Sequence, residues 1–271
     1  MNASLVKLAR RIVPSTATLS YNPLFRIVGN SLASLPNLVY PEFRDLPPNH
    51  LRVRVGVGNQ LFNNQVYHKT IATNLWFEWL ANNYCSATSR IVEIGCGCGR
   101  IAQHLDAPWF AGSYLGIDVD QELIAWSQRR FATPKFRFQL SPQHSRTYSS
   151  SAKGSGHFSF GDEPQTDFVY ATSLFTHLLE QETKNYIEET SRILKRGGTM
   201  YITFFSRQHV ALGGRWTFQH RIGNAYVESP TMPEAAVAYD HEFLSDLTRA
   251  AGFSEVRIVP GEGQSGLVAR K

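Results

Sequence analysis

The sequence predicts an α/β protein with a Rossmann-like, doubly wound and mostly parallel sheet. From about residue 89 to residue 271, short apolar runs alternate with amphipathic stretches of helical period, the pattern of strands joined by crossover helices. The first apolar run also leads directly into a glycine-rich stretch, "VEIGCGCGRI" at 92–101. Such a loop joins a strand to a helix at the ligand sites of doubly wound sheets.

Residues 1–60 precede this alternation and are expected to form a basic arm. They contain seven Lys and Arg and two acidic residues, whereas the remaining 20 basic and 20 acidic residues cancel. The stretch "SLVKLARRIV" at 4–13 is basic and amphipathic, which fits a membrane-surface contact, a transit peptide or a helix packed on the domain. The Pro-, Asn- and Ser-rich remainder to about residue 50 predicts a loop.

A stretch at 61–84 without helix breakers carries apolar residues near helical spacing and predicts the first long helix. Each later helix has one apolar side, as in "QELIAWSQRRF", and each strand is a short apolar or alternating run, as in "KFRFQL". The elements expected after the first helix are strand 90–95, helix 99–105, strand 113–119, helix 121–131, strands 135–140 and 166–173, helix 181–195, strand 199–205, helix 240–253 and strands 255–259 and 265–270.

Two polar, irregular segments interrupt the alternation, at about 141–166 and about 206–239. Long excursions from a compact sheet are usually lids or substrate walls. We therefore expect an arm at 1–60 and one domain at 61–271 that carries two lid-like insertions.

The glycine loop fits a nucleoside ligand better than a dinucleotide. In the dinucleotide fingerprint a third small residue lets the helix approach the strand, but Arg100 takes that position, so an NAD-dependent dehydrogenase is the weaker alternative. Asp118 ends the next strand, 19 residues after Gly99, where a carboxylate suits the two hydroxyls of a ribose. The combination indicates S-adenosylmethionine (SAM).

From about Ser89 to the C-terminus, the chain resembles the class I SAM-dependent methyltransferases. "VEIGCGCGR" resembles their glycine motif, "YLGIDVD" their ribose-binding strand end, and "RILKRGGTMYITFF" their fifth strand, with Arg196 in place of the usual proline. The resemblance implies a seven-stranded sheet that ends in a reversed hairpin. More narrowly, the segments at 46–56, 173–179 and 220–243 resemble methyltransferases of bacterial glycan and secondary-metabolite assembly.

This resemblance implies roles for individual residues. Glu93 would orient the loop and the amino group of SAM, Asp118 would hold the ribose, and Val119 would pack on the adenine. The other implied cofactor-binding residues are Gly95, Cys96, Gly97 and Gly99 along the methionine part and Ser173 beside the methyl donor. The family's usual acidic contact to adenine has no counterpart here, so the candidates to cover the ring are Tyr148, Phe158 and Phe160.

Missing family motifs favour an oxygen as the methyl acceptor. No Asn-Pro-Pro-Tyr or Asp-Pro-Pro-Tyr follows the fourth strand and no Pro-Cys pair is present, which disfavours methylation of amino groups in adenine or glutamine and of base carbons. The acid that holds magnesium in catechol-type enzymes is also missing, so we expect metal independence. An alcohol needs a general base, and the candidates are His177 after the fourth strand and His220 in the second insertion.

We expect the acceptor to be a hydroxyl of a saccharide or a glycosylated metabolite. The alternatives are a phenol, carboxylate or amine acceptor, or a catalytically silent SAM-binding subunit. The neutral body disfavours a nucleic-acid partner. No apolar run reaches the roughly 18 residues that cross a bilayer, and the three cysteines offer no disulfide framework. These features indicate a cytoplasmic enzyme whose membrane contact, if it has one, involves residues 1–41.

Overall fold

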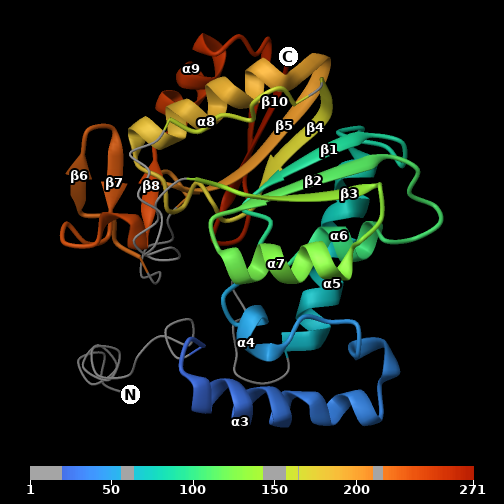
Figure 1. Ribbon diagram of the computed structural model, residues 1–271. Helices are drawn as coiled ribbons and strands as arrows, with labels where there is room; N and C mark the ends of the chain where they lie inside the picture. Colours follow the sequence, from blue (N-terminus) through green and yellow to red (C-terminus); the bar gives the residue numbers. More distant parts are fainter. Residues whose placement is uncertain (1–19, 56–63, 143–156, 164, 210–215) are drawn as a thin grey trace.

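The computed structural model describes residues 20–55, 64–142, 157–163, 165–209 and 216–271. At its centre is a ten-stranded sheet in which β3, β2, β1, β4 and β5 follow one another, and β5 is also paired with β10 and β8 (Figure 1). The strands are β1 (Arg90–Ile94), β2 (Ser113–Asp118), β3 (Phe136–Leu140), β4 (Thr166–Ala171), β5 (Leu194–Ser206), β6 (His220–Ile222), β7 (Ala225–Val227), β8 (Val237–Tyr239), β9 (Glu255–Val259) and β10 (Ser265–Arg270).

Helices cover both faces of the sheet (Figure 1). They are α5 (Asn64–Ala81), α6 (Arg100–Leu105) and α7 (Gln121–Arg130) on one face and α8 (Glu180–Ile193) and α9 (His241–Ala250) on the other. Ile91 of β1 belongs to the core layer of Trp79 from α5, whereas the next residue, Val92, belongs to the layer of Ile187 from α8. Alternate side chains of a buried strand therefore build two cores. Among the described helices, none is long and apolar enough to cross a membrane.

The strand directions confirm the predicted doubly wound sheet. Neighbours among β1 to β5 are parallel, and β10 runs antiparallel to both β5 and β9, which is the reversed C-terminal hairpin. The sequence does not predict β6, β7 and β8, which lie in the second insertion and extend the sheet beyond the end of β5. Each is only three residues long, too short to leave a recognisable periodicity.

The prediction of a loop up to about residue 50 is wrong. Asn22 accepts hydrogen bonds from the N–H groups of Leu24 and Phe25, and Pro23 occupies the first helical turn. Both residues favour the start of a helix, although the same residue types suggest a loop in sequence. The arm forms α3 (Pro23–Ser34), η1 (Leu35–Leu38), η2 (Pro41–Phe43) and α4 (Asn49–Arg52). The basic amphipathic stretch at 4–13 lies outside the described residues.

Charged side chains hold the arm against the first turn of α7. Arg54 forms ion pairs with Asp120 at 3.0 Å and with Glu122 at 2.7 Å, and its guanidinium lies 3.9 Å from the ring centroid of Tyr21. Asp120 is also the N-cap of α7. Arg26 of α3 forms two hydrogen bonds of 2.8 Å with the carboxylate of Glu122. Two acidic residues of α7 therefore anchor two arginines of the arm.

Replacing Arg54 should destabilise the protein far more than replacing Arg26. The Arg54 and Asp120 side chains are 1% and 6% exposed, so Arg54→Ala leaves a buried carboxylate without its cation and should lower the free energy of unfolding by about 3 kcal/mol. Arg26→Ala removes a pair that is 28% and 44% exposed and should cost less than about 1 kcal/mol. Equilibrium unfolding in urea measures both, and equal losses would contradict this account of the arm.

Candidate active site

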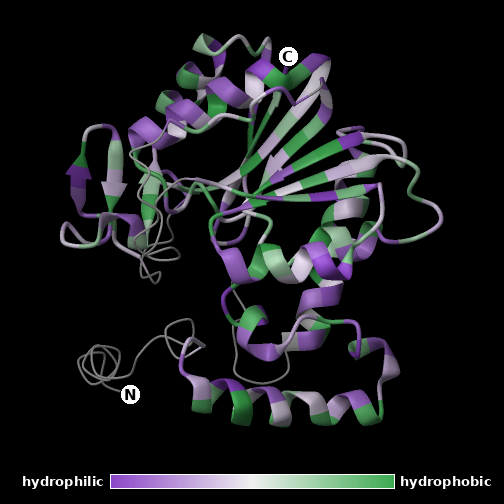
Figure 2. Ribbon diagram, viewed as in Figure 1, coloured by the Kyte–Doolittle hydropathy of each residue, from purple (hydrophilic) through white to green (hydrophobic). Residues whose placement is uncertain are grey.

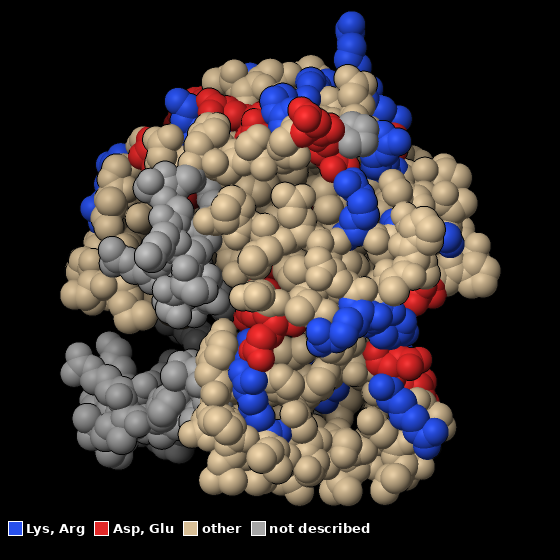
Figure 3. Space-filling view, viewed as in Figure 1, with Lys and Arg blue, Asp and Glu red and all other residues tan. Residues whose placement is uncertain are grey.

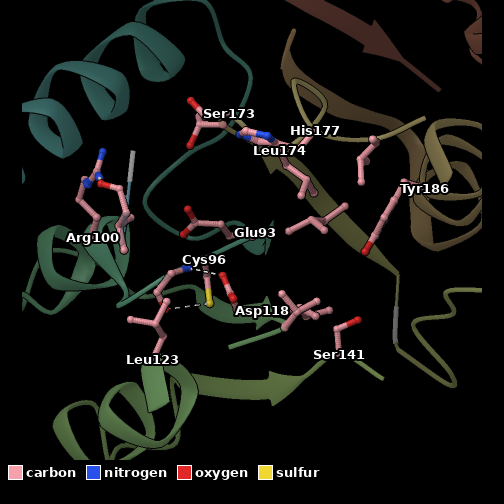
Figure 4. A pocket seen from close by; sticks show the side chains of 18 of the residues that line it. Glu93, Cys96, Arg100, Asp118, Leu123, Ser141, Ser173, Leu174, His177 and Tyr186 are labelled. Carbon is pink, nitrogen blue, oxygen red and sulfur yellow. Dashed lines mark hydrogen bonds between the residues drawn. The ribbon is translucent and has the colours of Figure 1, made fainter. Parts of the chain in front are cut away.

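A cavity lies at the carboxyl ends of β1, β2 and β4, where the strand order reverses between β1 and β4. Ligands of open α/β sheets bind at this position. Figure 4 shows Glu93 between Cys96 and Asp118 on one side and Leu174 and His177 on the other. The arm and the second insertion contribute as well, through Arg54, Val55 and Glu234.

The glycine loop after β1 has a backbone shape that requires glycine. Gly95 and Gly97 line the cavity with φ values of 76° and 55°, in the left-handed region. A Cβ at Gly97 would also lie 2.8 Å from the side chain of Val55 in the arm. Between them, Cys96 packs its sulfur beneath Gly116 of β2. The loop therefore presents backbone to the cavity while the arm lies close above it.

Asp118 fixes the loop from the end of β2. Its Oδ2 accepts a hydrogen bond of 2.7 Å from the N–H of Gly97, and its Oδ1 accepts one of 2.9 Å from the N–H of Asp120. Burial raises the pKa of this carboxyl to about 6, against the opposing effect of the backbone donors. Val119 lines the cavity beside it. The remaining lone pairs of the carboxylate could accept hydrogen bonds from a ligand.

Glu93 is a buried carboxylate between two tyrosines. The hydroxyls of Tyr114 and Tyr170 both donate to its Oε2. Burial raises the pKa of Glu93 to about 7, although the two hydroxyl donors act in the opposite direction. Glu93 also lines the cavity, so it can offer a negative charge to a cationic group of a ligand.

The loop between β4 and α8 places Ser173 and His177 on the opposite wall. Ser173 adopts a φ of 59°, and its N–H donates to the Thr203 hydroxyl over 2.7 Å. Nδ1 of His177 lies 2.8 Å from the carbonyl oxygen of Glu234 in the second insertion. A carbonyl can only accept, so Nδ1 carries a proton and the neutral ring has its lone pair on Nε2. Burial lowers the pKa of His177 below its ordinary value, which favours the neutral ring.

Two predicted site residues lie elsewhere. His220 is exposed on β6, the last strand of the path that leaves β5, and the second insertion reaches the cavity through Glu234 instead. The structure thus does not bring His220 to His177. Gly99 is not a lining residue either. It begins α6 with a φ of 71°, and a Cβ there would lie 2.8 Å from the ring of Phe131.

Of the three residues proposed to cover an adenine ring, the two that the structure describes, Phe158 and Phe160, do not line the cavity. Phe158 and Phe160 pack edge to face on each other at 4.7 Å, and Phe158 also contacts Tyr186 in the core beside α8. Tyr148 lies outside the described residues. A different tyrosine, Tyr186, lines the cavity from α8.

Sequence analysis missed the lining residues that come from distant segments. They are Arg54 and Val55 from the arm, Leu75 from α5, Glu182 and Tyr186 from α8 and Glu234 from the second insertion. No motif assigns a role to any of these residues, and the available signals were the expectations that the arm and the second insertion would cover the substrate and that the segments 46–56 and 220–243 resemble methyltransferases.

Residues 92–202 match the family model described as "Methyltransferase domain". Among solved structures, a possible exported protein from Bordetella parapertussis is 14% identical, with 100% of this chain and 97% of that chain covered and a TM-score of 0.52. Magnesium protoporphyrin IX methyltransferase (ChlM) from Synechocystis PCC 6803 with bound SAH is 13% identical over 90% of this chain and 98% of its own, with a TM-score of 0.50. DesVI from Streptomyces venezuelae is 14% identical over 75% and 91%, also with a TM-score of 0.50. At these identities the likeness is one of fold.

Affinity for S-adenosylhomocysteine should fall as the pH is lowered through the range of about 7 to 6. Burial raises the pKa of Glu93 to about 7 and that of Asp118 to about 6. If Glu93 binds the amino group and Asp118 the ribose diol, as the resemblance implies, protonation removes the charge of the first and some of the acceptor lone pairs of the second. Glu93→Gln should remove the part of this dependence near 7 and keep the part near 6. Calorimetry across this range measures both, and an affinity independent of pH would contradict the assignment.

Proposed function

We propose that this enzyme, whose chain carries a methyltransferase domain of the class I family that uses SAM, methylates an oxygen atom, and that its acceptor is a hydroxyl of a saccharide or a glycosylated metabolite. The family match supports the reaction class, and the fold is similar to that of magnesium protoporphyrin IX methyltransferase. The acceptor and the roles of individual residues are our inference from the cavity.

The residues around the cavity fit SAM as the methyl donor. The loop has no side chain at Gly95 and Gly97, Asp118 offers oxygens to a ribose diol, and Glu93 offers a carboxylate to an ammonium group. We therefore assign the cofactor contacts to Glu93, Gly95, Cys96, Gly97, Asp118, Val119 and Ser173. Gly99 shapes the start of α6 rather than the contact surface. When bound, SAM supplies an electrophilic methyl group on a positively charged sulfur.

The observation that carries the proposal is the orientation of His177. The Glu234 carbonyl holds the proton on Nδ1, so Nε2 can accept a proton from an acceptor hydroxyl. Because burial lowers the pKa of His177, the ring is neutral and able to act as a base at neutral pH. An acceptor hydroxyl that gives its proton to Nε2 becomes a better oxygen nucleophile, and alignment supplies most of the remaining catalysis.

Polar groups on the cavity wall support a polyhydroxylated acceptor. Glu182 and Tyr186 of α8 and Ser141 after β3 line the same cavity and can bond hydroxyl groups. The biological setting that we propose is glycan or secondary-metabolite assembly. In the proposed organisation, residues 61–271 form the catalytic domain and residues 1–60 form an arm that covers the substrate. All three cysteines are free thiols, which fits a cytoplasmic location.

The acceptor class can be identified by incubating the protein with SAM and a panel of sugars, nucleotide sugars, phenols, carboxylates and amines. We expect release of S-adenosylhomocysteine with a sugar hydroxyl and a methyl ether in the product. Products methylated only on nitrogen or on a carboxylate would contradict the O-methylation of a saccharide. Binding of SAM without any turnover over the whole panel would favour a silent subunit.

His177→Gln should lower kcat by about 10² to 10⁴, the usual contribution of a general base, and should leave the affinity for S-adenosylhomocysteine within about twofold. His220→Gln is the matched control and should keep full turnover, since His220 is exposed on β6. In the unsubstituted enzyme, kcat should decrease on the acid side of the ordinary histidine pKa of 6.5. Full activity of His177→Gln on the identified acceptor would remove His177 as the base.

Turnover should continue in the presence of EDTA, because a positioned base and an electrophilic sulfonium need no Lewis acid. The measurement is kcat before and after dialysis against the chelator. A loss of activity that magnesium restores would overturn the metal-independent mechanism.

A further inference from the structure

One face of the arm exposes a continuous set of large aliphatic side chains. We call it the α3 face, and its exposed fractions range from 46% to 77%. Green segments mark it along the lower edge of α3 in Figure 2, and the lower rim of the described residues is largely uncharged in Figure 3. The α3 face consists of Leu24, Ile27, Val28, Leu32, Leu35, Leu38 and Val39.

This exposure is a consequence of how α3 is attached. Its inner side buries Gly29 and Ala33, and Asn30 hydrogen-bonds both the backbone and the ring of His50 in α4. Arg26 adds the hydrogen bonds to Glu122 of α7. Small and polar residues therefore face the protein and aliphatic residues face outward, the reverse of an ordinary surface helix.

The α3 face is also the main concentration of exposed apolar groups. Of the fifteen large hydrophobic side chains that are exposed in the described ranges, nine lie between Tyr21 and Tyr40. Single exposed apolar residues are common, but a contiguous group of this kind marks an interaction surface.

Charge indicates what the surface binds. Residues 1–41 contain no acidic residue, and Lys7, Arg10 and Arg11 stand in the segment that leads directly into α3. An aliphatic helix face in a stretch of sequence with basic residues and no acidic ones fits a bilayer with anionic headgroups, because apolar burial and charge attraction then add. A second copy of this chain would instead bring two positively charged arms together.

We propose that the α3 face lies on an anionic membrane surface, with its aliphatic side chains in the headgroup region. The contact is interfacial and leaves the ion pairs of Arg26 and Arg54 with α7 intact. The α3 face and the cavity share no residue, so lipid and cofactor would bind at separate sites.

The test is co-sedimentation of the full-length protein with vesicles of equal parts phosphatidylglycerol and phosphatidylcholine, and with vesicles of phosphatidylcholine alone. We expect binding to the anionic vesicles that weakens with added salt. The triple variant Leu24→Asn, Ile27→Asn and Leu35→Asn should bind at least about tenfold more weakly. The matched control, Val66→Asn with Phe77→Asn, removes exposed apolar groups from α5 and should bind as the unsubstituted protein does.

Several outcomes would overturn the proposal. They are an absence of binding to the anionic vesicles, equal binding by the triple variant, and a dimer in sedimentation velocity that the triple variant converts to a monomer. Stronger binding to phosphatidylcholine vesicles after deletion of residues 1–19 would also overturn it, because it would mean that this segment, and not a membrane, covers the α3 face. A thermal shift with S-adenosylhomocysteine that matches the unsubstituted protein shows that each variant is folded, and it reports on the cofactor site independently of lipid binding.

Discussion

The hydrogen bond between the N–H of Gly97 and Oδ2 of Asp118 joins the ends of β1 and β2, and the form of the site depends on it. The N–H groups of Gly95 and Cys96 add bonds to the carbonyl of Ile117, so the loop is fastened along the whole end of β2. Parallel pairing of β1 with β2 brings the two segments to the same edge of the sheet. A loop held in this way presents its backbone, which is why glycines with positive φ are needed at its turns.

Burial raises the pKa of the acidic groups of the cavity and lowers the pKa of its histidine, and both shifts favour the uncharged form. It raises the pKa of Glu93 and Asp118 and lowers the pKa of His177, so each group is drawn toward its uncharged form. In the proposed function, the ammonium group and the sulfonium of SAM would compensate the carboxylates, whereas His177, the proposed base, must stay neutral. Burial of the cavity away from water therefore suits both a positively charged methyl donor and a neutral histidine base.

The sequence predicts the parts of this protein that rest on local chemistry. The strand period, the glycine loop and the position of Asp118 are each encoded within about thirty residues, and they identify the sheet and one wall of the cavity. Other parts depend on contacts between distant residues. Arg54 meets Asp120 across 66 positions, and Glu234 meets His177 across 57. Nothing in the local sequence distinguishes His177 from His220, because only the tertiary fold decides which of them lines the cavity. The sequence did not predict helix α3 for another reason. Asn22 and Pro23, which begin it, are residue types that are equally common in loops and at helix starts.

Asp120 belongs to two networks at once. Its N–H donates to Asp118, while its side chain caps α7 and pairs with Arg54 of the arm. A ligand that orders Asp118 therefore also orders the residue on which the arm docks. Thermodynamic reciprocity then requires that a docked arm tighten ligand binding by the factor by which the ligand tightens docking. Because the arm also carries the α3 face, and its Arg54 and Val55 line the cavity, attachment of that face to a surface would be linked to occupancy of the site through the contacts of Arg54 with Asp120 and Glu122.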